Sequence, residues 1–522
     1  MRKVALVVLV AATLAVAGGA YAWSEIVPGP PMTIAIVPGD DVVVAPTAQF
    51  QFASDIRDAR NRAIGTKPAW SSEAPIDERG LFTAPDRAGV YFVKAAIGEL
   101  TATTKITVKP GAPKTVRVLP ASATLKPRDT VAFSANAFDE WGNNVPVTPT
   151  WRVIAGTGSV DDQGIFTAGA AGASTIAMDV DGITTQATAT AQCVPPRTEV
   201  AGGLTFTVVC GANADVWLNG SGLDAATVTS TIDESVVAVE AAFGRAFRHR
   251  LNVNVFATKA GFDIGLKQVL RVQPTPYEEG VFIPPAIVAV DWSGSDAPEA
   301  LARHEITHLV VDEAAGRRVA VPFWLHEGLA TLNEFPVSAD TELVSRYCAA
   351  SAAKAGQMPV LSSIATGAGW RAYVNDVGVV AYYLAAQVAS FVVADAKSES
   401  NLLDKIGGGL PIESAYAAAS GRSFDTFTSE LGGRALALAD GFPGVTSTTR
   451  ESDGGTVYVL YGQPPDTRVN VSIANSRYAG SDSPKTNRYG CAIGLLGSSW
   501  PRGTYLVTLN GPAGRATATL VR

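Results

Sequence analysis

The sequence predicts a multidomain chain: two N-terminal all-β modules, an α+β domain and a C-terminal β-sandwich. Three observations predict this order. Residues 32–109 and 112–193 repeat one strand pattern, residues 215–442 are rich in alanine with helical periodicity, and residues 446–522 return to alternating strands. At 522 residues the chain is also too long for a single hydrophobic core.

The first 22 residues have the pattern of a secretory signal peptide. Arg2 and Lys3 precede an apolar run over residues 4–17, and small residues follow up to Ala22. The sequence therefore predicts a secreted or cell-surface protein. An uncleaved membrane anchor is the alternative, because the apolar stretch reaches almost to Trp23.

Composition agrees with an extracellular, β-rich protein. Charged residues are only 17%, and the 50 glycines and 31 prolines indicate many turns. The net charge of −7 gives no reason to expect nucleic-acid binding, which needs a concentrated basic face. The one basic cluster, from Arg245 to Arg250, is interpreted as a solvated helix end.

The two N-terminal modules match at three places along the chain. The matching pairs are Thr33–Pro38 with Thr115–Pro120, Trp70 with Trp151, and Gly80–Ala84 with Gly164–Ala168. This pattern resembles bacterial Ig-like domains. The resemblance implies two β-sandwiches that act in spacing or adhesion, with a cell-surface or extracellular-matrix partner.

The four cysteines permit disulfides in a secreted chain. Cys193 and Cys210 are the expected local pair around residues 194–214, which we predict to be a linker between domains. Cys348 and Cys491 would then join the α+β domain to the last domain, and two free buried thiols are the alternative for that pair.

Three of the four histidines lie within 23 residues, and two of them form the motif His304-Glu305-Ile306-Thr307-His308. On a helix, positions i and i+4 share one face, so both imidazoles can bind one metal ion beside Glu305. We predict this helix over residues 297–315. Asp296 would cap its start and Gly316 would follow its last turn as an αL residue.

A second helix, beginning near Pro322, supplies the expected third ligand. Eighteen residues separate Glu327 from His308, and Glu327 completes a His2Glu set of the kind that binds zinc. His326 lies about 100° further around the helix, so we interpret it as a neighbour of the cleft and not as a ligand.

The two motifs together, with Trp324, Gly328 and Ala330, resemble the HExxH-x18-E pattern of gluzincin metallopeptidases of the peptidase MA-like family. This resemblance implies a thermolysin-like zinc peptidase domain over residues 215–442, with protein or peptide substrates. It also implies that the strand at residues 287–292 forms the upper edge of the cleft and pairs with the substrate. An aminopeptidase is disfavoured, because no Gly-x-Met-Glu-Asn stretch precedes His304.

Zinc chemistry assigns further roles. Glu305 would be the general base, and the Asp312 carboxylate would orient a ligand imidazole by bonding to the nitrogen that does not bind the metal. The resemblance implies that Tyr382 or Tyr383 stabilises the oxyanion, although both could simply pack in the core. The competing class is a non-catalytic adhesion protein with an inactive peptidase-like domain.

Overall fold

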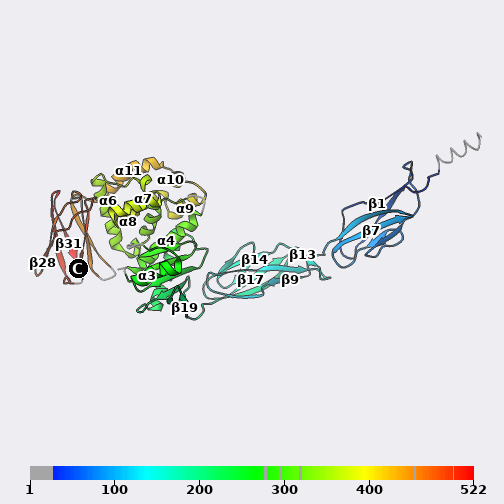
Figure 1. The fold of residues 1–522 in the computed structure, drawn as a ribbon, viewed down its shortest axis with the longest axis horizontal. Coiled ribbons are helices and arrows are strands. Elements are labelled where there is room, and N and C mark those ends of the chain that lie inside the picture. The colour runs from blue at the N-terminus through cyan, green and yellow to red at the C-terminus, as the bar shows by residue number, and fades with distance from the viewer. Residues whose placement is uncertain (1–26, 275–278, 294–296, 317–319, 451–453, 498) are drawn as a thin grey trace, which may run out of the picture. The chain divides into compact units, whose positions relative to one another are not determined.

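The computed structural model describes residues 27–274, 279–293, 297–316, 320–450, 454–497 and 499–522. Figure 1 labels the helices and strands along the chain. The predicted signal peptide, residues 1–22, lies outside the described residues. Within the described ranges, no helix combines the length and apolarity needed to cross a membrane. The chain divides into two compact units, described separately below.

The first unit contains the two predicted β modules. The strands of the first module are β1 (Thr33–Val37), β2 (Val42–Val44), β3 (Gln49–Gln51), β4 (Ala53–Arg57), β5 (Ala69–Ser72), β6 (Leu81–Thr83), β7 (Gly89–Ile97) and β8 (Leu100–Val108). Its four-stranded sheet has the order β2-β8-β7-β5, and β1-β4 and β3-β6 are smaller sheets.

The second module repeats this arrangement. Its strands are β9 (Thr115–Leu119), β10 (Ser122–Leu125), β11 (Thr130–Ala132), β12 (Ser134–Phe138), β13 (Asn144–Val145), β14 (Thr150–Ala155), β15 (Gly158–Val160), β16 (Ile165–Ala168), β17 (Gly172–Val180) and β18 (Ile183–Ala191). Its four-stranded sheet has the corresponding order β10-β18-β17-β14.

The repeated Trp and Gly have a common physical cause. Gly80 has φ +80°, and a Cβ atom there would lie 2.9 Å from the Trp70 ring; Gly164, with φ +82°, stands in the same relation to Trp151. Each turn must therefore have a residue without a side chain at the point where it crosses the indole.

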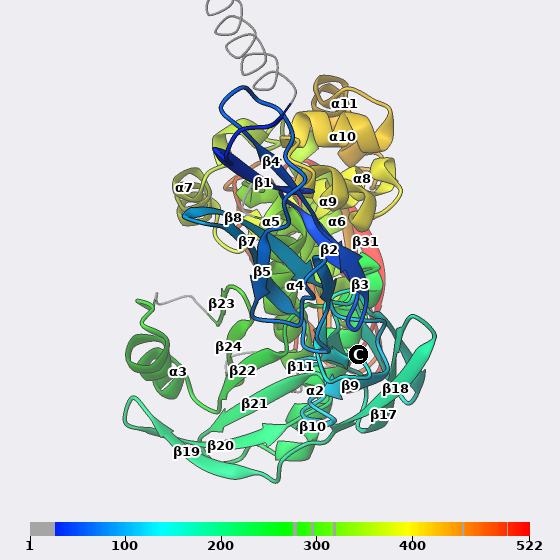
Figure 2. The same ribbon diagram turned by 90° about the vertical axis from the view of Figure 1, so that its right-hand side faces the viewer.

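The second unit begins with a six-stranded sheet of order β19-β20-β21-β22-β24-β23. Figure 2 shows these strands as one twisted layer. Their bounds are β19 (Arg197–Ala201), β20 (Leu204–Cys210), β21 (Ala214–Asn219), β22 (Leu251–Phe256), β23 (Gly280–Ile283) and β24 (Ile287–Asp291).

This sheet corrects the predicted linker at residues 194–214. Those residues form β19 and β20, because Gly202 and Gly203, with φ +55° and +78°, make the two-residue turn of a hairpin. Phe206 and Val208 of β20 are buried in the sheet's core. The cysteine pairing was predicted correctly: Cys193 is bonded to Cys210, and Cys348 to Cys491.

Helices form the rest of this domain. They are α2 (Ala225–Phe243), α3 (Lys259–Gly265), α4 (Pro298–Ala315), α5 (Phe323–Leu332), α6 (Ala339–Lys354), α7 (Gly367–Val377), α8 (Val380–Ala396), α9 (Glu399–Gly407), α10 (Ile412–Ser420) and α11 (Phe424–Leu436). One face of the sheet shares a core with α2 and α4 through Val216, Val253 and Val288. Phe256 and Phe262 pack on the opposite face.

The basic cluster follows the end of α2, but it is only partly the solvated helix end that we predicted, because Arg250 is buried. Helix α2 ends at Phe243, because Gly244 adopts the αL conformation. The Arg250 guanidinium is buried; it donates to the carbonyl oxygens of Gly211 and Ala214 and forms an ion pair with Asp215. Arg250 thus neutralises the buried Asp215 carboxylate and is not part of an exposed basic face, whereas 78% of the Arg248 side chain is exposed.

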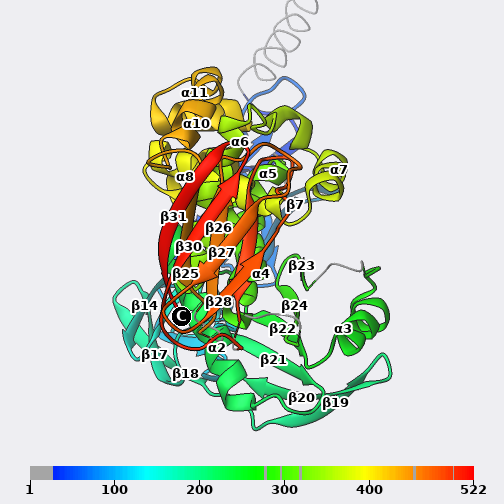
Figure 3. The same ribbon diagram turned by 90° about the vertical axis from the view of Figure 1, so that its left-hand side faces the viewer.

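The C-terminal residues form the predicted β-sandwich. Its strands are β25 (Gly444–Thr449), β26 (Thr456–Tyr461), β27 (Asn470–Ala474), β28 (Ala479–Asp482), β29 (Ala492–Leu496), β30 (Thr504–Gly511) and β31 (Gly514–Val521), in sheets β25-β26-β29 and β28-β27-β30-β31. Figure 3 shows them in orange and red. Val459 and Tyr461 share a buried cluster with Val344 of α6, so the sandwich packs directly on the helical domain.

Candidate metal centre

Helix α4 places four polar side chains of the predicted site on one element. It spans Pro298–Ala315, with Pro298 at its first position and no side-chain cap at Ala297; the predicted cap, Asp296, lies outside the described residues. Gly316 has φ +62° but ψ −169°, so it is not the αL residue that we predicted. His304, Glu305, His308 and Asp312 lie along this helix at spacings that bring them to one side.

Helix α5 faces α4 and is held close to α8. A Cβ atom at Gly328 would lie 2.5 Å from the carbonyl oxygen of Ala385 and 3.0 Å from the Cβ of Ala389. Only glycine therefore permits this approach of the two helices. Leu325 and Leu329 are fully buried on the core side of α5, and Glu327 projects toward α4.

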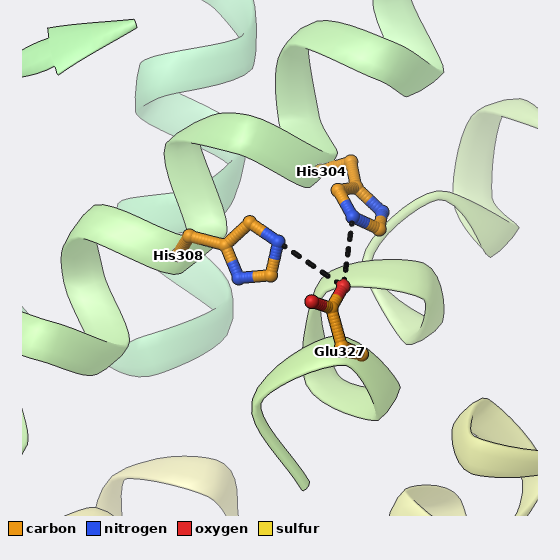
Figure 4. Close-up of side chains that lie close together, drawn as sticks. All are labelled: His304, His308 and Glu327. Carbon is orange, nitrogen blue, oxygen red and sulfur yellow. Dashed lines mark ion pairs between the residues drawn. The ribbon is translucent and has the colours of Figure 1, made fainter. Parts of the chain in front are cut away.

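His304, His308 and Glu327 meet between the two helices (Figure 4). Glu327 Oε2 lies 3.5 Å from His304 Nε2 and 3.4 Å from His308 Nε2. Within the described ranges this is the one group of His, Cys, Asp or Glu side chains close enough to share a metal ion. Tetrahedral zinc with bonds of about 2.0 to 2.1 Å separates its ligand atoms by roughly 3.3 Å. Both nitrogen–oxygen distances are close to this value, and all three ligand atoms lie within 4.8 Å of one another.

Burial and mutual contact shift the pKa values of all three side chains. Burial lowers the pKa of His308 to about 4, against the attraction of Glu327. Burial also acts to lower the pKa of His304, but its hydrogen bonds to Glu327 and Glu334 dominate and raise that pKa well above the ordinary value. Burial tends to raise the pKa of Glu327, and the two histidines overcome it and hold that pKa well below its usual range.

Glu334 is a partner that sequence reasoning missed. Its Oε1 lies 2.7 Å from His304 Nδ1, the nitrogen that faces away from Glu327. A carboxylate in this position orients a ligand imidazole and fixes which nitrogen carries the proton. The one available signal was its place seven residues after Glu327, a spacing of about two helical turns, although Glu334 lies just beyond the end of α5 at Leu332.

Asp312 and His326 are arranged differently from our prediction. Asp312 Oδ1 lies 3.2 Å from His326 Nε2. Among the described residues, Asp312 forms no hydrogen bond with His304 or His308. His326 Nδ1 lies 2.6 Å from His308 Nδ1. His326 is therefore not one of the three residues that could share a metal ion, but it is in direct contact with His308.

Strand β23, and not the predicted β24, forms the edge of the sheet beside these residues. β24 is paired on both sides, with β22 and with β23, whereas β23 ends the strand order. Phe282 of β23 stacks on His308, with ring centroids 4.5 Å apart. A Cβ atom at Gly280 would overlap Glu305 Oε1 and lie 2.6 Å from its Cδ, so the Glu305 carboxylate rests against this strand.

The two predicted tyrosines lie on α8 in different surroundings. The Tyr382 ring centroid is 6.3 Å from that of His304 and 5.3 Å from that of Trp370. Tyr383 packs in the cluster shared with the C-terminal sandwich. Burial and nearby carboxylates, Glu334 first, raise the Tyr383 pKa above its ordinary value, so its hydroxyl keeps its proton at neutral pH.

Comparison with known proteins leaves the family open: no family model and no curated protein matches the sequence. Among solved structures, domains 4 and 5 of the S-layer protein SbsC match over 31% of this chain and 99% of theirs, at 16% identity and TM-score 0.18. The first four Ig domains of Dscam1 match over 32% of this chain and 47% of theirs, at 10% identity and TM-score 0.21. This chain also covers only 32% of SbsC domains 1–6. Such low scores support no conclusion about function.

Proposed function

We propose that the second unit is a zinc-dependent peptidase and that Glu305 is its general base. The observation that carries the proposal is the meeting of His304, His308 and Glu327 at distances suited to one tetrahedral ion. When bound, zinc lowers the pKa of water in its open coordination position and polarises a carbonyl oxygen.

The chain's own residues account for the remaining chemistry. Glu305 directly follows His304 on α4, and its buried carboxylate lies against Gly280 of the edge strand. From this place it would take a proton from the attacking water and return it to the nitrogen of the leaving amine. Tyr382, beside His304, would donate its hydroxyl proton in a hydrogen bond to the oxyanion.

The edge strand favours an extended peptide as the substrate. Among the described residues β23 is paired with β24 on one side only, and its other side could accept a further strand. Because Gly280 adjoins Glu305 and Phe282 covers His308, a peptide paired to β23 would run past the proposed base and ligands.

We further propose that the protein acts outside the cell. All four cysteines form disulfides, which persist in oxidising compartments. The two N-terminal modules would then serve as spacers or bind a cell-surface or matrix partner.

The test compares the parent protein with Glu305→Gln in metal analysis and in digestion of a peptide library. We expect about one zinc per chain in both, and a loss of roughly 10² to 10⁴ in turnover in the variant, the usual contribution of a general base. Equal turnover in the two proteins would remove Glu305 as the base. Zinc without cleavage in either protein would favour the non-catalytic adhesion protein.

A further inference from the structure

His326 is a buried histidine for which the proposed reaction gives no role. It directly precedes Glu327 on α5, and only 11% of its side chain is exposed. Its Nδ1 lies 2.6 Å from His308 Nδ1, and its Nε2 lies 3.2 Å from Asp312 Oδ1. One imidazole therefore connects a proposed ligand with a carboxylate one helical turn further along α4.

These distances exclude His326 as a fourth ligand of the same ion. Two nitrogen ligands of tetrahedral zinc lie roughly 3.3 Å apart, whereas the two Nδ1 atoms are closer than that. His308 also turns its other nitrogen, Nε2, toward Glu327. The contact between the two histidines is thus a hydrogen bond on the side of His308 that faces away from the metal position.

Only one arrangement of protons is consistent with a metal ion on His308 Nε2. A neutral imidazole that gives this lone pair to a cation carries its proton on Nδ1. His308 Nδ1 then donates to His326 Nδ1, which must be unprotonated. The His326 proton consequently lies on Nε2, where it donates to Asp312 Oδ1.

Phe282 holds the two imidazoles in the orientation that this bond requires. The rings of His308 and His326 are inclined by only 16°, and Phe282 stacks on both, with centroid distances of 4.5 and 5.4 Å. His304, in contrast, has a carboxylate partner, Glu334. The two proposed histidine ligands are therefore oriented by different chemistry.

We infer that His326 is a positioning residue: a neutral imidazole that accepts the Nδ1 proton of His308, is itself held by Asp312, and so directs His308 Nε2 at the metal. This inference rests on the proposed metal centre. It replaces the expectation that Asp312 orients a ligand directly.

Two variants of the full-length protein test whether His326 acts by accepting the His308 proton or only by filling space. His326→Leu keeps an apolar side chain of moderate size but offers no acceptor. His326→Asn places a carbonyl oxygen close to the position of Nδ1 and restores the acceptor without the link to Asp312. His249→Leu is the matched control, because His249 is exposed and outside the site.

Two measurements are made on each protein: zinc affinity by competition with a chelator, and proton NMR of the cobalt-substituted protein. In the parent, two exchangeable, paramagnetically shifted imidazole N–H signals are expected, one from His304 and one from His308. In His326→Leu we expect zinc affinity to fall about 10- to 100-fold, the usual effect of losing such a partner, and one N–H signal to be lost by exchange with water. His326→Asn should recover the signal and most of the affinity, and His249→Leu should match the parent.

Failure of the positioning role and failure of the metal centre would give different results. If His326→Leu binds zinc like the parent and keeps both signals, or if His326→Asn is as impaired as His326→Leu, the positioning role is wrong while the metal centre stands. If the parent binds neither zinc nor cobalt, the proposed metal centre fails and the positioning role fails with it.

Discussion

Gly280 of the edge strand lies directly against the side chain of Glu305, the proposed base. A side chain there would meet the end of Glu305, which is a flexible group and can move aside. Gly280→Ala should therefore displace the carboxylate without unfolding the protein. Because a shift of about 1 Å in a catalytic group can cost roughly 10² in rate, we expect a loss of that order in kcat/KM with unchanged zinc content.

Gly441→Ala serves as the control for this prediction, because a Cβ atom at Gly441 would meet nothing within 4 Å. Thermal unfolding of both variants shows whether the fold is kept. If Gly280→Ala cleaved peptides as fast as the parent, Glu305 would not depend on its contact with β23.

The two tyrosines of α8 can be separated by removing one hydroxyl at a time. Tyr382 lies beside His304, whereas Tyr383 packs toward the C-terminal sandwich. We expect Tyr382→Phe to lower kcat by roughly 10² to 10³, as loss of an oxyanion donor does, and to leave zinc content unchanged. Tyr383→Phe is its matched neighbour and should change kcat little. Unchanged kcat in both variants would show that neither hydroxyl takes part.

Glu399, at the start of α9, is a buried carboxyl group whose pKa is raised to about 7 by burial, against a weaker opposing effect of Asn333. Its Oε2 has no hydrogen-bond partner among the described residues. Since the folded-state pKa is above the unfolded value of 4.5, the folded protein binds more protons between these values. Stability should thus fall as pH rises from about 4.5 to 7, by an amount on the order of 3 kcal/mol.

Glu399→Gln should abolish most of this slope in the unfolding free energy, because the amide does not titrate. Denaturant unfolding of both proteins at several pH values tests the prediction. Parallel pH profiles for the two proteins would show that Glu399 does not titrate in this range.

At the scale of elements, the position of α5 depends on the absence of a side chain at Gly328. Gly328→Ala would press a methyl group against the backbone of Ala385 in α8, and helix backbone cannot yield as a side chain does. We expect a loss of about 1 to 3 kcal/mol in unfolding free energy, together with weaker zinc binding because Glu327 moves with its helix.

Gly432→Ala is the matched control in α11, since it is also a helical glycine but has open space around it. It should stabilise the protein by about 0.5 to 1 kcal/mol, because alanine loses less backbone entropy in a helix. A Gly328→Ala variant as stable as Gly432→Ala would show that α5 and α8 can separate without cost.

Elements whose pattern is local were predictable from the sequence. His304 and His308 share a helix face by spacing alone, and helices α4 and α5 lie where their boundary residues placed them. Glu334, His326 and Gly280 were missed or undervalued because their contacts arise only when α4, α5 and β23 approach one another. No local pattern encodes such an approach.

At the scale of the whole chain, composition and repeats predicted the order of domains, and the cysteines predicted a crosslink to the last one. The strands at residues 194–214 and the core that the last domain shares with α6 were not predicted. Residues 194–214 were interpreted as a linker because paired glycines suggest a flexible segment as readily as a hairpin turn. The sharing of one core by α6 and the C-terminal sandwich was also not predictable. Val344 and Val459 belong to ordinary apolar patterns, and neither pattern indicates which element the residue will pack against.

The Cys348–Cys491 disulfide joins this sandwich to α6 across 143 residues of sequence, whereas Cys193–Cys210 spans only 17. A crosslink restricts the unfolded chain more when it closes a longer loop, and the logarithm of the length ratio gives a difference of about 2 kcal/mol. Replacing Cys348 and Cys491 together by alanine should therefore destabilise the second unit more than the same change at Cys193 and Cys210.

Calorimetry of the two double variants measures this difference. Because α6 and the sandwich share a buried cluster, the loss should appear as a lower Tm of one common transition. Zinc content at 25 °C should stay at the parent value, since none of the four cysteines is among His304, His308 and Glu327, the proposed ligands. A separate early transition for the sandwich would mean that the disulfide, and not the shared core, holds the two parts together.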